Sequence, residues 1–144
     1  MNNQQLRDEI IKEALSWVGT PFHWSQSVKG QGCDCGGFLI GVFKELGLVP
    51  KSMMVPVVPH GIFYHKSVTV YEDLVAQYCH QVDFKDVLPA DILLFVMGKS
   101  AAHGAIYLPD NKFISCVIDY GVVVSDLDDK WMKRLHSTWR YKEL

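Results

Sequence analysis

Short apolar runs in the C-terminal half of the chain, bounded by turn-forming residues, constrain the fold most strongly. They cover residues 92–96, 104–108, 112–117 and 121–124. The last three are separated by Pro109-Asp110-Asn111 and Asp119-Tyr120-Gly121. Apolar runs of this length between turn signals are typical of strands joined by short connections. The sequence therefore predicts an antiparallel meander in this half.

The N-terminal half has helical spacing instead. Apolar side chains recur every three or four residues from Leu6 to Val18, and Gly19 follows. The same spacing predicts a second helix from Cys35 to Leu46, ended by Gly47. Between these helices, residues 21–32 are rich in glycine, proline and serine and are predicted to form an irregular loop.

Three shorter elements complete the expected order. A short helix is expected over Tyr71–Tyr78, a last helical segment over Leu127–Leu135, and an extended piece over Ser137–Tyr141. Helices come first and strands later, which is typical of an α+β fold rather than of alternating βαβ units. We expect N-terminal helices packed on an antiparallel β-sheet.

Composition supports one domain over residues 1–144. In a chain of 144 residues, a second core would leave each half close to the size at which burial alone becomes insufficient. A hydrophobic content of 49% with 21% charged residues is that of a globular protein. The net charge of −2 gives no basic footprint, so nucleic acid is not expected as a partner.

Neither a membrane span nor an export signal is expected. No apolar run approaches the ~20 residues that a transmembrane helix requires. Residues 1–5 have neither a basic region nor an apolar region of a signal peptide. We therefore expect the chain to be made in the cytoplasm, where its four cysteines remain thiols available for metal binding, catalysis or packing.

Cys35 is the candidate nucleophile. It lies at the expected first turn of the second helix, directly after Asp34 and before Gly36. Unpaired backbone N–H groups and the positive end of the helix dipole favour a thiolate at such a position. The alternative is that Cys35 is a small buried hydrophobe and the glycines only allow close packing. Asp34 is a candidate N-cap on either interpretation.

His103 is the candidate general base. A thiolate nucleophile needs a base that later returns the proton to the leaving group, and histidine is the usual residue. Of six histidines, His103 opens an apolar strand, from which a rigid sheet would aim the ring at a helix start. A structural role is the alternative. Trp24, beside the loop that leads to Cys35, is a candidate supporting residue.

In a series of motifs the chain resembles the NlpC/P60 cell-wall peptidases. In order along nearly the whole chain, the motifs are Trp17-Val18-Gly19-Thr20-Pro21-Phe22-His23-Trp24, Cys33-Asp34-Cys35-Gly36-Gly37-Phe38, Pro89-Ala90-Asp91-Ile92-Leu93-Leu94-Phe95, His103-Gly104-Ala105-Ile106-Tyr107-Leu108 and Phe113-Ile114. The chain looks closest to the branch found in phage genomes and gene-transfer agents. The likeness to this branch rests on residues 121–127, Trp131 and Trp139-Arg140-Tyr141.

The resemblance implies a reduced papain-like fold and a role for each matching residue. Cys35 matches the family nucleophile and His103 the base. The third catalytic position, which orients the imidazole, falls on Ser115, where the common residue is histidine. A serine hydroxyl can accept the other ring N–H, but it carries no charge and reaches less far. Further departures are Gly36 in place of a frequent serine and Phe22 in place of a common tyrosine.

The function that the resemblance implies is acyl transfer without a cofactor. We expect a cysteine peptidase that cuts the peptide stem of bacterial peptidoglycan, commonly between γ-D-glutamate and a diamino acid. Residues Phe63–Val70 are expected to line the substrate groove. Such an enzyme would act at the bacterial cell wall, delivered there by a phage particle, with phage tail proteins as further partners.

Three alternatives remain open from the sequence. A zinc site could use Cys33, Cys35, Cys116 and His103, although a Cys-x-Cys spacing is tighter than that of most zinc sites. A catalytically weak module that binds the cell wall or belongs to a phage tail is the second. The third is an amidase or acyltransferase that uses the same thiol chemistry on another amide or ester.

Overall fold

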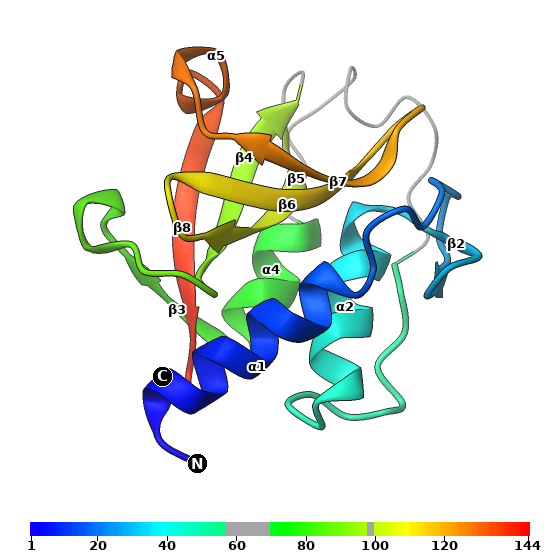
Figure 1. The fold of residues 1–144 in the computed structure, drawn as a ribbon, viewed down its shortest axis with the longest axis horizontal. Helices are drawn as coiled ribbons and strands as arrows, with labels where there is room; N and C mark the ends of the chain where they lie inside the picture. The colour runs from blue at the N-terminus through cyan, green and yellow to red at the C-terminus, as the bar shows by residue number, and fades with distance from the viewer. Residues whose placement is uncertain (57–69, 98–99) are drawn as a thin grey trace.

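The structure is a computed structural model in which helices cover one face of an antiparallel sheet (Figure 1). It describes residues 1–56, 70–97 and 100–144. The helices α1 (Asn3–Leu15), α2 (Cys35–Glu45) and α4 (Val70–Ala76) gather on this face, and each of them contacts strand β5 (Ser100–Leu108). Within the described ranges, no helix combines the length and the apolar character needed to cross a membrane.

Six strands of the described chain form the main sheet, in the order β3-β8-β4-β5-β6-β7, and every neighbouring pair is antiparallel. The bounds of the other five are β3 (Cys79–Val82), β4 (Ile92–Met97), β6 (Lys112–Val117), β7 (Gly121–Asp126) and β8 (Leu135–Tyr141). The expected α+β fold is confirmed. The predicted meander is the consecutive set β4 to β7.

The C-terminal segment departs from the predicted order. Strand β8 does not extend the meander but inserts between β3 and β4, where it pairs with both. The last helix, α5 (Asp129–Met132), is shorter than the predicted segment Leu127–Leu135 because Leu135 already belongs to β8. Strand β3 was not predicted. The expected helix over residues 71–78 ends directly before it.

The N-terminal half also differs in detail. Helix α1 begins one turn before the predicted start at Leu6, because Asn2 and Gln5 form a capping box with two hydrogen bonds of 2.8 Å. It ends at Leu15, and Val18 lies beyond it, 53% exposed. The predicted irregular loop contains a small hairpin of β1 (Ser27–Val28) and β2 (Gly32–Cys33). A single 3-10 turn covers Phe84–Asp86.

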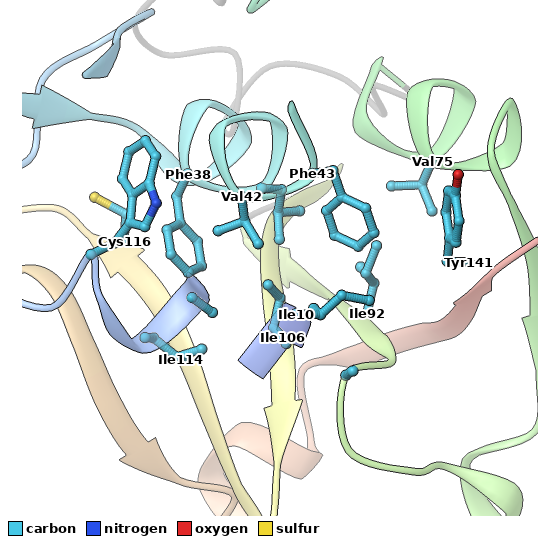
Figure 2. Close-up of a cluster of buried hydrophobic side chains, with 14 of the residues drawn as sticks. Ile10, Phe38, Val42, Phe43, Val75, Ile92, Ile106, Ile114, Cys116 and Tyr141 are labelled. Atoms are coloured by element: carbon cyan, nitrogen blue, oxygen red, sulfur yellow. The ribbon is translucent and has the colours of Figure 1, made fainter. Parts of the chain in front are cut away.

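Buried hydrophobic side chains form two clusters, one on each face of the sheet. In the larger cluster, Phe38 and Val42 of α2 point toward Ile106 and Ile114 of the sheet (Figure 2). The members of the second cluster include Leu93, Phe95, Ala105, Phe113 and Leu127, with Trp131 packed against them. Side chains of successive strand residues alternate between faces, so strands such as β4 contribute to both clusters.

A buried carboxylate joins the ends of the fold. The side chain of Asp91, immediately before β4, is fully buried and lies 3.0 Å from Arg7 of α1 and 2.8 Å from Arg140 of β8. A buried charge needs such partners because desolvation otherwise costs several kcal/mol. The pairs therefore hold α1 and β8 against the start of the central strand β4.

Candidate active site

The start of α2 is fixed by its N-cap. The carboxylate of Asp34 accepts hydrogen bonds from the backbone N–H groups of Gly37 at 2.7 Å and Ser25 at 2.8 Å. These bonds tie the preceding loop to the first turn of the helix. Burial raises the pKa of Asp34 in spite of these bonds, which lower it. Asp34 is therefore the N-cap that the sequence predicted, and Cys35 is the first residue of the helix.

The thiol of Cys35 lies against strand β5. Its sulfur is hydrogen-bonded to the backbone N–H of Gly104 and to the hydroxyl of Tyr71, and the residue is 6% exposed. Burial, together with the nearby negative charge of Asp34, raises the pKa of Cys35 to about 12. The prediction that the helix start favours a thiolate is thus wrong for the resting protein, because desolvation outweighs the hydrogen bonds.

Tyr71 is a site residue that sequence reasoning missed. It lies on α4, is 4% exposed, and its ring packs directly on Gly36. A Cβ atom added at Gly36 would lie 2.3 Å from Cε1 of Tyr71, so the phenol ring occupies the space that a side chain at position 36 would need. Helical spacing predicted the helix around Tyr71, but nothing in the local sequence indicates that this helix packs beside Cys35.

His103 lies on β5, one residue before the Gly104 amide that contacts the thiol. Its ring stacks on Trp131, with ring centroids 5.6 Å apart and planes at 29°, and it also contacts Phe95 at 6.1 Å. The imidazole is therefore held within the second cluster. Adjacent strand residues face opposite sides of the sheet, so the Gly104 amide meets the predicted nucleophile, whereas the ring of the predicted base packs on Phe95 and Trp131 on the other face.

The environment of His103 keeps its imidazole neutral. Burial, together with the positive charge of Arg134, lowers the pKa of His103 to about 4. The Arg134 guanidinium lies 5.6 Å from the centroid of Trp131, on which His103 stacks. A neutral imidazole can accept a proton, which is the form that a general base requires.

Ser115 does not make the hydrogen bond that the sequence predicted. It is fully buried on β6, two residues after Phe113, and therefore faces the second cluster together with His103. Within the described ranges, Oγ of Ser115 and Nε2 of His103 both lack a hydrogen-bond partner. The short serine side chain thus leaves two buried polar atoms unsatisfied, which is uncommon in folded proteins.

The remaining predicted residues lie around the start of α2. Gly36 carries the contact with Tyr71 described above. Trp24 is half-buried in the preceding loop, and its ring meets Phe22 edge-on at 4.9 Å. Phe22 in turn bridges to Cys33 of β2. Of the predicted groove, residues 63–69 lie outside the described residues, and Val70 is the first residue of α4.

The cysteines do not form the zinc site of the first alternative. In the parts of the chain that the structure describes, no group of three or more His, Cys, Asp or Glu side chains is arranged to hold a metal ion. The Cys116 thiol instead donates a hydrogen bond of 3.0 Å to the carbonyl of Cys33, and both residues are buried. Cys79 lies on strand β3.

The model of the NlpC/P60 family matches residues 19–140. The chain belongs to the NlpC/P60 family. It is similar to the murein DD-endopeptidase MepS/murein LD-carboxypeptidase of Escherichia coli K12, with 24% identity over 142 residues, covering 97% of this chain and 65% of that protein. The chain thus spans slightly less than two thirds of this relative.

Two further comparisons concern the branch and the fold. Tail tip assembly protein K of Escherichia phage lambda is 32% identical over 72 residues, covering 49% of this chain and 36% of that protein. A solved NLP/P60-family structure from Staphylococcus aureus, described as similar to lipoprotein, matches with a TM-score of 0.66 and 20% identity, covering 98% of this chain and 42% of that one. The NlpC/P60 fold is therefore present over nearly the whole chain.

Proposed function

We propose that this protein is a cysteine peptidase that hydrolyses an amide bond in the peptide stem of bacterial peptidoglycan. One observation carries the proposal: the Cys35 thiol at the start of α2 is hydrogen-bonded to the backbone N–H of Gly104, the residue that follows His103 on β5. Membership of the NlpC/P60 family and the likeness to a murein endopeptidase support it. The bond between γ-D-glutamate and a diamino acid is the proposed site of cleavage.

The proposed reaction requires the His103 imidazole, which packs on Trp131 in the structure, to reach the sulfur of Cys35. His103 then accepts the proton of Cys35 while the sulfur attacks the amide carbonyl carbon. The negative charge moves to the carbonyl oxygen, and N–H groups at the start of α2 are suited to stabilise it. The C–N bond then breaks, and His103 gives its proton to the leaving amine. Finally His103 activates a water molecule, which hydrolyses the thioester and restores the thiol.

The resting pair has a thiol and a neutral imidazole rather than two ions. With the pKa of Cys35 raised to about 12 and that of His103 lowered to about 4, proton transfer between them is unfavourable before substrate binds. Attack therefore depends on contacts that develop with the substrate and stabilise the transferred charge. We expect a slow enzyme for this reason.

Mass spectrometry of purified muropeptides after incubation with the protein tests this function. The wild type is expected to cut one stem-peptide bond, and the fragment masses identify it. Cys35→Ala should cut nothing, whereas Cys79→Ala, which removes a thiol on strand β3, should cut like the wild type. Equal cleavage by Cys35→Ala, or none by the folded wild type, would contradict the proposal. Products from another amide or ester would identify an amidase or acyltransferase.

A second candidate function is a catalytically weak module that binds the cell wall or forms part of a phage tail. The unsatisfied Nε2 of His103 beside a buried Ser115 favours it, because a base without an orienting partner is a poor catalyst. The partial likeness to a phage tail tip protein supports the phage-tail form of this candidate. Sedimentation with purified cell walls, without any released peptide, would support this candidate.

The place of action belongs to the same proposal. We infer that the protein acts at the bacterial cell wall and reaches it with a phage particle. Antibody detection of the chain in purified virions is expected to be positive. Its presence only in the cell lysate would contradict this route without affecting the peptidase chemistry.

A further inference from the structure

We propose that Tyr71 is a catalytic residue whose hydroxyl donates a hydrogen bond to the sulfur of Cys35 and stabilises the thiolate during attack. The inference rests on the proposed peptidase function, in which Cys35 is the nucleophile. It concerns a contact between elements that are distant in the sequence, because Tyr71 lies on α4 and Cys35 begins α2.

The contact is built into the packing of the two helices. Tyr71 is 4% exposed and Cys35 is 6% exposed, so the hydroxyl and the sulfur meet away from bulk water. Helix α4 also contacts β5, the strand that offers the Gly104 N–H to the same sulfur. The sulfur therefore has two donors from two different elements, one a backbone amide and one a phenol.

Gly36 makes this arrangement possible. An added Cβ atom there would lie 2.3 Å from Cε1 of Tyr71 and 3.2 Å from both Cδ1 and Cζ. A separation of 2.3 Å is far below van der Waals contact, so any other residue at position 36 would displace the ring. The position of the phenol beside the nucleophile thus requires the glycine that follows the nucleophile.

The chemistry of the two groups fits a donor role. Burial and the neighbouring Cys35 raise the pKa of Tyr71, so the phenol keeps its proton at neutral pH. The hydrogen bonds from Gly104 and Tyr71 are the contributions that lower the pKa of Cys35 against the larger effect of burial. Hydrogen bonds to an ionised acceptor are about twice as strong as neutral ones, so this contact strengthens as the thiol ionises.

Tyr71 moves no proton in this role. The proton of Cys35 passes to His103, the Sγ–C bond forms, and the carbonyl π electrons move to oxygen. Throughout, the phenol O–H bond stays intact and its hydrogen bond offsets the negative charge on sulfur before the new bond is complete. Removal of the hydroxyl therefore raises the barrier to attack without removing the nucleophile.

Tyr71→Phe tests the inference, because it deletes only the hydroxyl and keeps the ring on Gly36. We expect kcat/KM for muropeptide cleavage to fall about 10- to 100-fold, the range expected for loss of a charge-assisted hydrogen bond. We also expect alkylation of Cys35 by iodoacetamide, followed by peptide mass spectrometry, to require higher pH than in the wild type. Tyr78→Phe is the matched control and should change neither quantity.

A second variant tests the same hydrogen bond without deleting the hydroxyl. Replacing Tyr71 by 3-fluorotyrosine keeps the ring and makes its hydroxyl a stronger donor. We expect the alkylation profile of Cys35 to move to lower pH in this variant. Gly36→Ala, which displaces the ring, should resemble Tyr71→Phe.

The outcomes separate this inference from the proposed function. If the wild type cuts muropeptides and Tyr71→Phe keeps kcat/KM within twofold with an unchanged alkylation profile, Tyr71 has no catalytic role although the peptidase assignment stands. If the wild type cuts nothing, the peptidase assignment fails. A shifted alkylation profile would then still show the contact between Tyr71 and Cys35, and an unshifted profile would overturn it.

Discussion

The two halves of the candidate site differ in how well their polar groups are satisfied. The sulfur of Cys35 has two hydrogen-bond donors, from Gly104 and Tyr71. By contrast, Nε2 of His103 and Oγ of Ser115 are buried without a partner in the described parts of the chain. The nucleophile is thus held by directional contacts, whereas the base is held mainly by stacking on Trp131. We infer that the base, rather than the nucleophile, limits the rate of this site.

The largest expected effect is loss of the base. His103→Gln keeps a side chain of similar length but removes the group that accepts the thiol proton. General-base catalysis contributes about 10² to 10⁴ in rate, so kcat/KM for muropeptides should fall by about 1000-fold. His80→Gln, on the exposed side of β3, is the matched control. A loss smaller than tenfold, with unchanged thermal unfolding, would show that another residue is the base.

The next effect concerns stability against pH. The pKa of His103 is lowered to about 4 in the folded protein from an ordinary value of 6.5. Between pH 6.5 and pH 4 the unfolded chain binds a proton at His103 that the folded protein does not bind. The contribution of the neutral, buried imidazole to the free energy of unfolding is therefore fully present above pH 6.5 and is lost as the pH falls toward 4. The loss amounts to about 3 kcal/mol.

Urea denaturation at several pH values measures this loss. The free energy of unfolding should decrease from pH 7 to pH 4 in the wild type. It should decrease by less in His103→Gln, because that side chain does not titrate. Parallel curves for the two proteins would mean that the imidazole is not buried as a neutral group.

A smaller effect is expected from repair of the base. Ser115→His offers a ring nitrogen to Nε2 of His103 and introduces the histidine that the family resemblance leads us to expect at this position. Partners of this kind change activity about 10- to 100-fold, so we expect kcat/KM to rise by about tenfold. Ser125→His on β7 is the control. Unchanged kcat/KM in a folded Ser115→His protein would remove the base as the limiting half of the site.

The smallest expected effect comes from the charge near the base. Arg134 lowers the pKa of His103, although less than burial does. Arg134→Gln should therefore raise that pKa and move the acid limb of the pH–kcat/KM profile to higher pH, with about a twofold change of rate at neutral pH. Lys133→Gln is the neighbouring control. If the acid limb does not shift, the low pKa of His103 is due to burial alone.

Local signals account for the parts of the fold that could be predicted. Asp34 as N-cap, α2 from Cys35 and strands β4 to β7 all follow from caps, turn residues and alternating apolar side chains. Family motifs then singled out Cys35 and His103 as candidates, and the structure places the thiol of Cys35 against the amide of Gly104, the residue after His103. These features depend on a few residues close together in the chain, so they can be predicted from the sequence.

Tertiary structure alone decided the remaining features. The insertion of β8 between β3 and β4 and the approach of Tyr71 to Cys35 join segments distant in the sequence, and only packing brings them together. The protonation of Cys35 was misjudged for the same reason. A helix start favours the thiolate, but the charge is opposed by burial, which depends on every element that covers the sulfur. The sequence by itself thus determined which residues are candidates for the chemistry, and the packing around them decided their protonation states and hydrogen-bond partners.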